Sequence, residues 1–309
     1  MEYGNRAMSE ILHLKTISEL YRFLNLGSSD HPLIGIVDFS KTIESAKDEI
    51  KIKTSFYSIM FKNYCRNHIR YGRNTLDFQD GSLVCIAPNR VITIDNDIEV
   101  NDNMMGWGLF FHPDLIRGSA LGYKMKDYSF FSYEVSEALH LAEKEKQLLH
   151  DCILMIEAEL KQNIDSYSQT LIVSNIELLL NYCTRYYGRQ FITRKNYNVD
   201  IVTKVENILR DYFENEHNRN EGLPTVKELA DKVNLSPNYL SDLLKRETGL
   251  SAQDHIHYVI IEQAKNILVQ TNYSVSEIAY SLGFEYPQYF SRLFKQKTGK
   301  TPLEFRLDN

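Results

Sequence analysis

The chain has 309 residues, more than one domain usually holds, and this length predicts two domains that each bury a core of their own. Hydrophobic residues make up 43% and charged residues 25% of the sequence, which excludes an intrinsically disordered chain. The net charge of −6 excludes a uniformly basic surface that would bind nucleic acid indiscriminately.

The sequence contains no apolar segment of the kind that directs a chain into or across a membrane. The first thirty residues lack the apolar core of a signal peptide, and no run reaches the roughly 18 apolar residues that span a bilayer. We therefore expect a cytoplasmic protein without a membrane partner. The four cysteines include no Cys-x-x-Cys pair, which favours buried thiols in a reducing compartment over a zinc site or disulfides; they are Cys65, Cys85, Cys152 and Cys183.

Short β-rich runs separated by turn signals fill residues 32–113. The runs are 33–39, 54–61, 83–87, 91–94 and 106–111. Many short strands predict an antiparallel sandwich or barrel. Apolar residues then recur at helical spacing, which predicts helices over 143–162 and 166–187. The second of these helices has a wide apolar face, which includes Leu171, Leu178 and Tyr182 and serves either as a dimer surface or for packing within its own domain.

Residues 188–198 lose the helical periodicity and are the best candidate for a linker, which gives predicted domains at 1–190 and 199–309. The remainder reads as helices with little chain between them. Each helix start carries a capping signal: Thr225 with Glu228, Ser236 with Pro237, Ser251 with Asp254, Ser274 with Glu277, and Thr301 with Pro302. Because such residues satisfy free backbone N–H groups, they define the helix boundaries.

The last third of the chain contains an internal repeat. Residues 226–249 align with residues 275–299, with one residue inserted in the turn of the second copy. Each copy has the pattern of a helix-turn-helix, which predicts two such units at 225–249 and 274–299. Gly283 suits the positive φ that a tight turn often requires, and the first copy has Asn234 there, the next-best residue for that conformation.

One helix is predicted over residues 251–271, between the two units. Its length of about 31 Å is close to the roughly 34 Å between successive major grooves on one face of B-DNA. The second helices of the two units could therefore enter adjacent grooves of one duplex. Their predicted buried residues are Leu240, Leu243 and Leu244 in the first unit, and Phe290, Leu293 and Phe294 in the second.

Residues 199–306 resemble the AraC/XylS family of bacterial transcription regulators. The resemblance is carried by SEIAYSLGF at 276–284, YFSRLFK at 289–295 and TGKTPLEFR at 298–306, and it covers about a third of the chain. It implies an α+β protein with an N-terminal cupin-like regulatory β-barrel, a helical dimerisation segment and a C-terminal all-α DNA-binding domain. It further implies a homodimeric activator that binds promoter DNA, responds to a small-molecule effector and contacts RNA polymerase. Ile260 departs from the family, which usually carries an arginine there.

The resemblance also places the base-reading positions. They fall on Asn238, Ser241 and Asp242 of the first unit and on Gln288, Ser291 and Arg292 of the second; Lys245, Arg246, Tyr289 and Lys295 complete the predicted DNA-binding set. Arg292 can bond bidentately to guanine, whereas Asp242 could accept only from cytosine and would repel phosphate. We therefore expect the second unit to bind more strongly.

The charge of this region depends on where it is counted. Acidic residues outnumber basic ones from residue 199 onward, yet residues 286–303 contain no acid. This stretch carries four cations, namely Arg292, Lys295, Lys297 and Lys300. The sequence therefore predicts a local +4 face on an acidic body, with modest affinity for random DNA.

The N-terminal domain has three candidate roles, of which the first is catalysis. A metal-dependent enzyme would need a histidine cluster, but His68 and His112 have no partners at suitable spacing, so we predict no enzyme, metal or cofactor. Five aromatic residues on or beside the strands could line an effector pocket or pack only as core: Tyr57, Phe61, Tyr64, Trp107 and Phe110. The third role is dimerisation or polymerase contact alone.

Overall fold

The computed structural model describes residues 11–41, 50–62, 68–71, 74–76, 81–95, 106–214 and 222–308. The chain divides into two compact units, residues 1–192 and residues 193–309. The first unit mixes strands and helices and the second is helical, which confirms the predicted α+β class. None of the described helices is both long and apolar enough to cross a bilayer.

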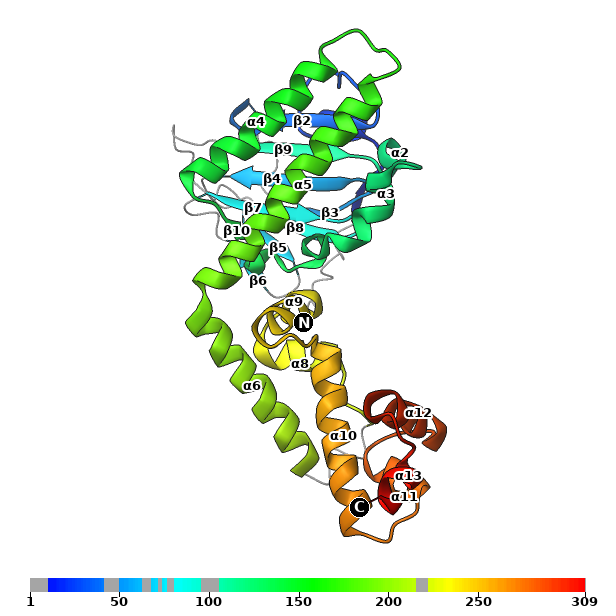
Figure 1. Cartoon of the computed structure of the whole chain (residues 1–309). Coiled ribbons are helices and arrows are strands. Elements are labelled where there is room, and N and C mark those ends of the chain that lie inside the picture. Colours follow the sequence, from blue (N-terminus) through cyan, green and yellow to red (C-terminus); the bar gives the residue numbers. More distant parts are fainter. Residues whose placement is uncertain are drawn as a thin grey trace, which may run out of the picture. The chain divides into compact units, whose positions relative to one another are not determined.

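Two five-stranded sheets form among the described residues of the first unit (Figure 1). The first sheet has the order β1 (Leu12–Leu14), β3 (Ile50–Thr54), β8 (Val91–Asp95), β5 (His68–Tyr71) and β6 (Asn74–Leu76). The second has the order β10 (Leu139–His140), β7 (Ser82–Ile86), β4 (Tyr57–Lys62), β9 (Gly106–Phe111) and β2 (Ile34–Asp38). Buried side chains from both sheets form one core, which includes Ile52, Ile92, Met60, Val84 and Phe110.

The sheets differ from the predicted antiparallel barrel in two ways. The described strands pair as two separate sheets, and no closed barrel is seen among them. β1 pairs with β3 in parallel, so the purely antiparallel prediction is wrong. A parallel pair needs a crossover connection, and α1 (Ile17–Phe23) and β2 lie in the chain between the two strands. A three-residue strand such as β1 is too short to show alternation in the sequence.

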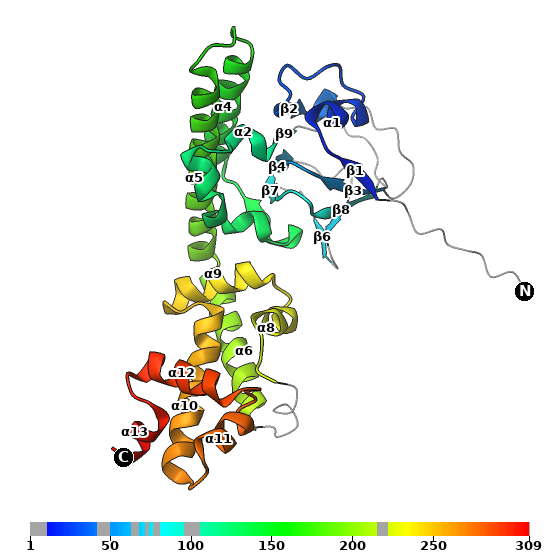
Figure 2. The ribbon, with the colours of Figure 1, turned by 90° about the vertical axis from the view of Figure 1, so that its right-hand side faces the viewer.

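Helices α4 (Glu143–Leu160) and α5 (Ser168–Thr193) lie along the second sheet (Figures 1 and 2). The thiols of Cys85 in β7 and Cys183 in α5 are in contact there. Short helical segments connect β9 to β10: α2 (Pro113–Ile116), α3 (Ala120–Lys124), η2 (Met125–Asp127), η3 (Ser129–Ser132) and η4 (Val135–Glu137), with η1 (Phe39–Lys41) following β2.

The division between the two units falls inside the predicted linker at 188–198, but this segment is helical except at Arg194 and does not lose its helical structure as the sequence pattern suggested. α5 continues to Thr193, and α6 (Lys195–Glu214) begins two residues later. The side chain of Gln190 explains why the apolar periodicity is lost here although the helix continues. It is buried, accepts the His140 N–H at 2.8 Å and donates to the Ala138 carbonyl at 3.1 Å. A buried polar residue that is satisfied in this way interrupts the apolar periodicity but continues the packed face of the helix.

The described residues of the second unit form the helices α6, α8 (Val226–Val233), α9 (Pro237–Thr248), α10 (Ala252–Gln270), α11 (Val275–Ser281), α12 (Pro287–Thr298) and α13 (Pro302–Leu307). From α8 onward, these helices are joined by short turns. All five predicted caps are confirmed. The hydroxyls of Thr225, Ser236, Ser251, Ser274 and Thr301 each accept the backbone N–H three residues on, at 3.2 to 3.3 Å.

Candidate nucleic-acid interface

The two predicted helix-turn-helix units are the pairs α8–α9 and α11–α12. Their turns close with equivalent hydrogen bonds, from the Leu235 N–H to the Ala230 carbonyl and from the Phe284 N–H to the Ala279 carbonyl, both 3.0 Å. Asn234 has a φ of 57° and Gly283 a φ of 92°, so the predicted left-handed residue is confirmed in each turn.

The second helix of each unit occupies the position of a recognition helix. Figure 2 shows α9 and α12 lying across α10 at two levels and running in similar directions. The 19 residues of α10 correspond to a length of about 28 Å. Leu240, Leu243, Leu244, Phe290 and Phe294 are buried as predicted, whereas Leu293 is only partly buried.

The predicted DNA-contacting residues lie at matching positions of the two recognition helices. Asn238, Ser241, Asp242 and Lys245 follow the i, i+3, i+4, i+7 spacing of one helix face, and so do Gln288, Ser291, Arg292 and Lys295. Asn238, Lys245, Arg246, Gln288, Arg292 and Lys295 are exposed, and Ser241, Asp242 and Ser291 are partly exposed. Each of the two recognition helices therefore presents a polar strip at its surface, formed by these four residues.

The hydroxyl of Ser241 forms a hydrogen bond to α10 that the sequence did not indicate. It accepts the backbone N–H of Ala252, in the first turn of α10, at 3.4 Å. The two residues are 11 positions apart and belong to different helices. No local pattern predicts such a contact. A base contact by Ser241 would have to share or replace this bond.

The two recognition helices differ at their aligned tyrosines. Tyr239 is 1% exposed, whereas Tyr289 is 52% exposed. The guanidinium carbon of Arg292 lies 5.2 Å from the centre of the Tyr289 ring, a cation–π contact. The Tyr286 and Tyr289 rings also meet edge to face, with centroids 5.8 Å apart. Tyr289 therefore supports the Arg292 side chain within the polar strip of α12.

The predicted +4 face is wrong, because two of its four cations form ion pairs. Lys297 Nζ lies 2.8 Å from Asp254 Oδ1, and Lys300 Nζ lies 2.7 Å from Asp308 Oδ2. The hydrogen bond from Lys297, helped by one from Ser251, lowers the pKa of Asp254 to about 2. Arg292 and Lys295 form no ion pair within 4 Å of a described residue, although Lys295 interacts at longer range with the Glu304 carboxylate. The positive charge that remains on this face therefore lies on the polar strip itself.

The described aromatics of the predicted effector pocket lie on two faces of the second sheet. Tyr57, Phe61 and Trp107 share one face, with the Phe61 and Trp107 rings 5.9 Å apart. Phe110 points to the opposite face, where it meets Phe56 edge to face in the core between the sheets. Tyr64 lies outside the described residues. The structure therefore does not gather these side chains around one cavity.

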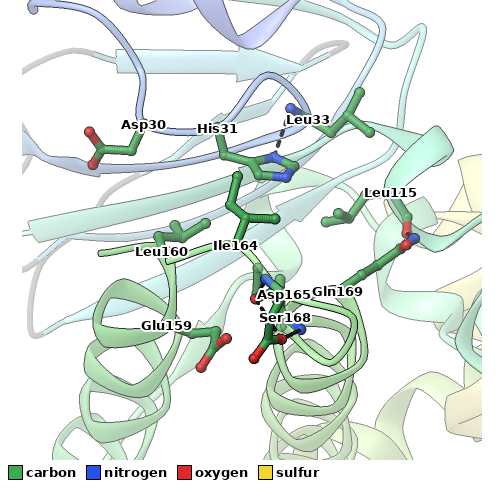
Figure 3. A pocket seen from close by; sticks show the side chains of 11 residues that line it. Asp30, His31, Leu33, Leu115, Glu159, Leu160, Ile164, Asp165, Ser168 and Gln169 are labelled. Atoms are coloured by element: carbon green, nitrogen blue, oxygen red, sulfur yellow. Dashed lines mark hydrogen bonds between the residues drawn. The ribbon is translucent and has the colours of Figure 1, made fainter. Parts of the chain in front are cut away.

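A hollow of about 250 Å³ lies elsewhere in the first unit, beside the turn between α4 and α5 (Figure 3). Three acidic residues line it, Asp30, Glu159 and Asp165, together with His31. His31 Nδ1 accepts the Leu33 N–H at 3.1 Å, and burial lowers the pKa of this imidazole. None of the predicted pocket aromatics lines this hollow.

The histidines singled out in the sequence lie in separate elements, whereas two of the cysteines, Cys85 and Cys183, are in contact. His112 caps α2, with its Nδ1 accepting the Asp114 N–H at 3.2 Å, and His68 lies in β5. Cys85, Cys152 and Cys183 are buried free thiols, whereas Cys65 lies outside the described residues. Within the described ranges, no three His, Cys, Asp or Glu residues are placed to hold a metal ion.

The C-terminal part of the chain is similar to known proteins. A family model described as a helix-turn-helix domain matches residues 229–308. An uncharacterized HTH-type transcriptional regulator of Escherichia coli, YijO, is 25% identical over 186 residues, covering 60% of this chain and 62% of its own. The bifunctional transcriptional activator/DNA repair enzyme AdaA of Bacillus subtilis is 38% identical over 82 residues, covering 26% of this chain and 39% of its own.

These matches span less than two thirds of the length of either relative. Among solved structures, the C-terminal domain of the response regulator AraT from Geobacillus stearothermophilus matches 35% of this chain and 85% of its own, with 28% identity and a TM-score of 0.31. The relatives that share the C-terminal region are named as transcription regulators. Residues 229–308 of this chain are a helix-turn-helix domain of the AraC type.

Proposed function

We propose that the chain is a sequence-specific transcription regulator that binds double-stranded DNA through α9 and α12. The observation that carries the proposal is the repetition of one polar strip on two helices mounted on α10. The length of α10, about 28 Å, approaches the roughly 34 Å between successive major grooves on one side of the duplex. Each recognition helix would enter one groove, and α10 would set the spacing between the two half-sites.

The experiment that tests this function is selection of binding sites from random duplexes by the full-length protein. We expect enrichment of sequences with two half-sites separated by about one helical turn, roughly 10 base pairs. The acidic body should keep affinity for random DNA low, so the selection should be run at low and at physiological salt. If no sequence is enriched at either salt concentration, the protein does not function by specific DNA recognition.

Arg292 and Lys295 should contribute to binding in different ways. Arg292→Ala should cost about 1–3 kcal/mol on the preferred site and relax the preference at one base pair, because a bidentate bond to guanine is lost. Lys295→Ala is the matched comparison: it should weaken all sequences alike and flatten the salt dependence. Titrations of both variants against the selected site and a scrambled duplex measure the difference. Equal losses on the two duplexes for Arg292→Ala would exclude it from base reading.

The first unit is proposed to regulate this binding. By resemblance we propose a cupin-like domain of a cytoplasmic activator, in which a small-molecule effector alters dimerisation or contact with RNA polymerase. The unpartnered apolar face of α5 supports a homodimer: Leu171 and Leu178, two helical turns apart, are 47% and 41% exposed. Genome-wide occupancy measured with and without candidate small molecules would reveal an effector response.

Breaking this face should dissociate the dimer without unfolding the chain. The double substitution Leu171→Glu/Leu178→Glu places two like charges in the proposed interface, and we expect sedimentation velocity to shift from dimer to monomer. Val269→Glu is the control, because Val269 is exposed on α10, in the second unit and outside α5. A double variant that sediments like the parent chain would remove α5 from the interface.

A further inference from the structure

The first turn of α10 contacts both recognition helices. From α9, Thr248 Oγ1 lies 2.8 Å from His255 Nε2, and Ser241 Oγ accepts the Ala252 N–H. From α12, Lys297 Nζ donates to Asp254 Oδ1 at 2.8 Å. Residues 251–255 therefore bond to two helices that are separated by about forty residues in the chain.

Asp254 is fixed by the helix start to which it belongs. Its backbone N–H donates to the capping hydroxyl of Ser251 at 3.2 Å, and that hydroxyl in turn donates to Asp254 Oδ2 at 2.7 Å. The second carboxylate oxygen, Oδ1, is left for Lys297. A carboxylate in the first turn is also favoured by the helix dipole. Asp254 therefore offers an oriented, ionised acceptor to α12.

The internal repeat gives Lys297 a counterpart. Residue 297 aligns with Glu247 of α9, by the offset that aligns Thr248 with Thr298. Glu247 Oε1 accepts from Asn198 Nδ2, on α6, at 3.0 Å. The same position near the end of each recognition helix thus ties that helix to a neighbour, α9 to α6 and α12 to α10. The two ties differ in chemistry, since only the second joins opposite charges.

We propose that Asp254 is a positioning residue that, through Lys297, holds α12 at a fixed orientation relative to α9. This inference rests on the proposed DNA-binding function and adds the device that keeps two half-sites in register. The pair lies at the surface, with side chains 40% and 35% exposed, so it contributes little to folding. Its effect is on orientation, which matters only when both recognition helices must bind one duplex.

The test compares the full-length protein and its Asp254→Asn variant on two duplexes. One duplex carries both half-sites at the selected spacing. The other duplex carries only the half-site that α12 recognises. We expect Asp254→Asn to weaken binding about threefold to tenfold on the tandem site and to leave the single half-site unchanged. Asp254→Glu, which keeps a carboxylate within reach of Lys297, should restore most of the tandem affinity.

Lys297→Gln separates positioning from direct contact with DNA. If Lys297 acts through Asp254, Lys297→Gln should show the same tandem-only loss, and the double variant should lose no more than either single variant. If Lys297 instead binds phosphate, Lys297→Gln should also weaken the single half-site while Asp254→Asn does not, and the proposal fails.

A measurement without DNA keeps this inference distinct from the proposed function. Spin labels at the exposed positions Arg246 and Gln296 report the distance between α9 and α12. We expect a broader distance distribution in Asp254→Asn than in the parent chain. Identical distributions would overturn the positioning role even if DNA binding is confirmed, whereas failure of the parent chain to select any site would refute the DNA-binding function alone.

Discussion

Replacing Phe290 with alanine should lower the free energy of unfolding of the second unit by about 3–5 kcal/mol. Phe290 is fully buried at the start of α12, and its ring lies 5.4 Å from Phe284 in the turn and 5.8 Å from Phe294 one helical turn later, measured between centroids. Removing the ring leaves a cavity between the turn and the recognition helix. Because a loss of this size is a large fraction of typical domain stability, α12 should lose its fixed position.

The loss can be assigned to one unit, because Trp107 is the sole tryptophan and lies in the first unit. Thermal unfolding of Phe290→Ala followed by circular dichroism should show an early helical transition. The transition seen by tryptophan fluorescence should stay near that of the parent chain. Tyr289→Ala is the control, since its exposed ring should cost roughly 1 kcal/mol or less. Equal destabilisation by the two variants would contradict the burial pattern of α12.

The features that the sequence predicted correctly in the second unit are local ones. A capping residue and its partner are three positions apart, and the two helix-turn-helix turns each need one residue with positive φ. Asn234 and Gly283 supply that residue, and both are recognisable by type. Such signals depend on backbone geometry within one turn, so they are legible without knowledge of the tertiary structure.

The features that the sequence concealed involve distant residues. Lys297 and Asp254 are 43 positions apart, and the stretch 286–303 seemed unopposed only because its acidic partners lie outside it. The same holds for Lys300, whose partner is Asp308. Charge counted along a segment therefore overstates the field at its surface, and the excess is removed by pairing that only packing reveals.

The spacing of the aromatic residues in the first unit already indicates which of them share a face of the sheet. Trp107 and Phe110 are three positions apart in one strand, and side chains at odd separations point to opposite faces of a sheet. The sequence could thus have excluded a single pocket containing both. Tyr57 and Phe61 are four apart and do share a face, as the structure places them.

The turn between α11 and α12 should be sensitive to the addition of a single methyl group at Gly283. Gly283→Ala should destabilise the second unit by about 2–4 kcal/mol, from the cost of a left-handed alanine and from a close contact. A Cβ at this position would lie 3.1 Å from the carbonyl carbon and oxygen of Gly222, and 3.4 Å from the Leu223 nitrogen. These are backbone atoms, which cannot move aside as the end of a flexible side chain could.

Asn234→Gly is the matched control in the first turn, because it changes the equivalent residue while keeping a type that accepts positive φ. It should alter stability by less than about 1 kcal/mol, through the added freedom of the unfolded chain. The same unfolding experiment, with circular dichroism reporting helices and Trp107 reporting the first unit, compares the two. If Gly283→Ala proved as mild as Asn234→Gly, the α11–α12 turn would have to relax away from Gly222. The fixed placement of α12 on which two-groove binding depends would then need support from the helices packed against it, α10 and α13.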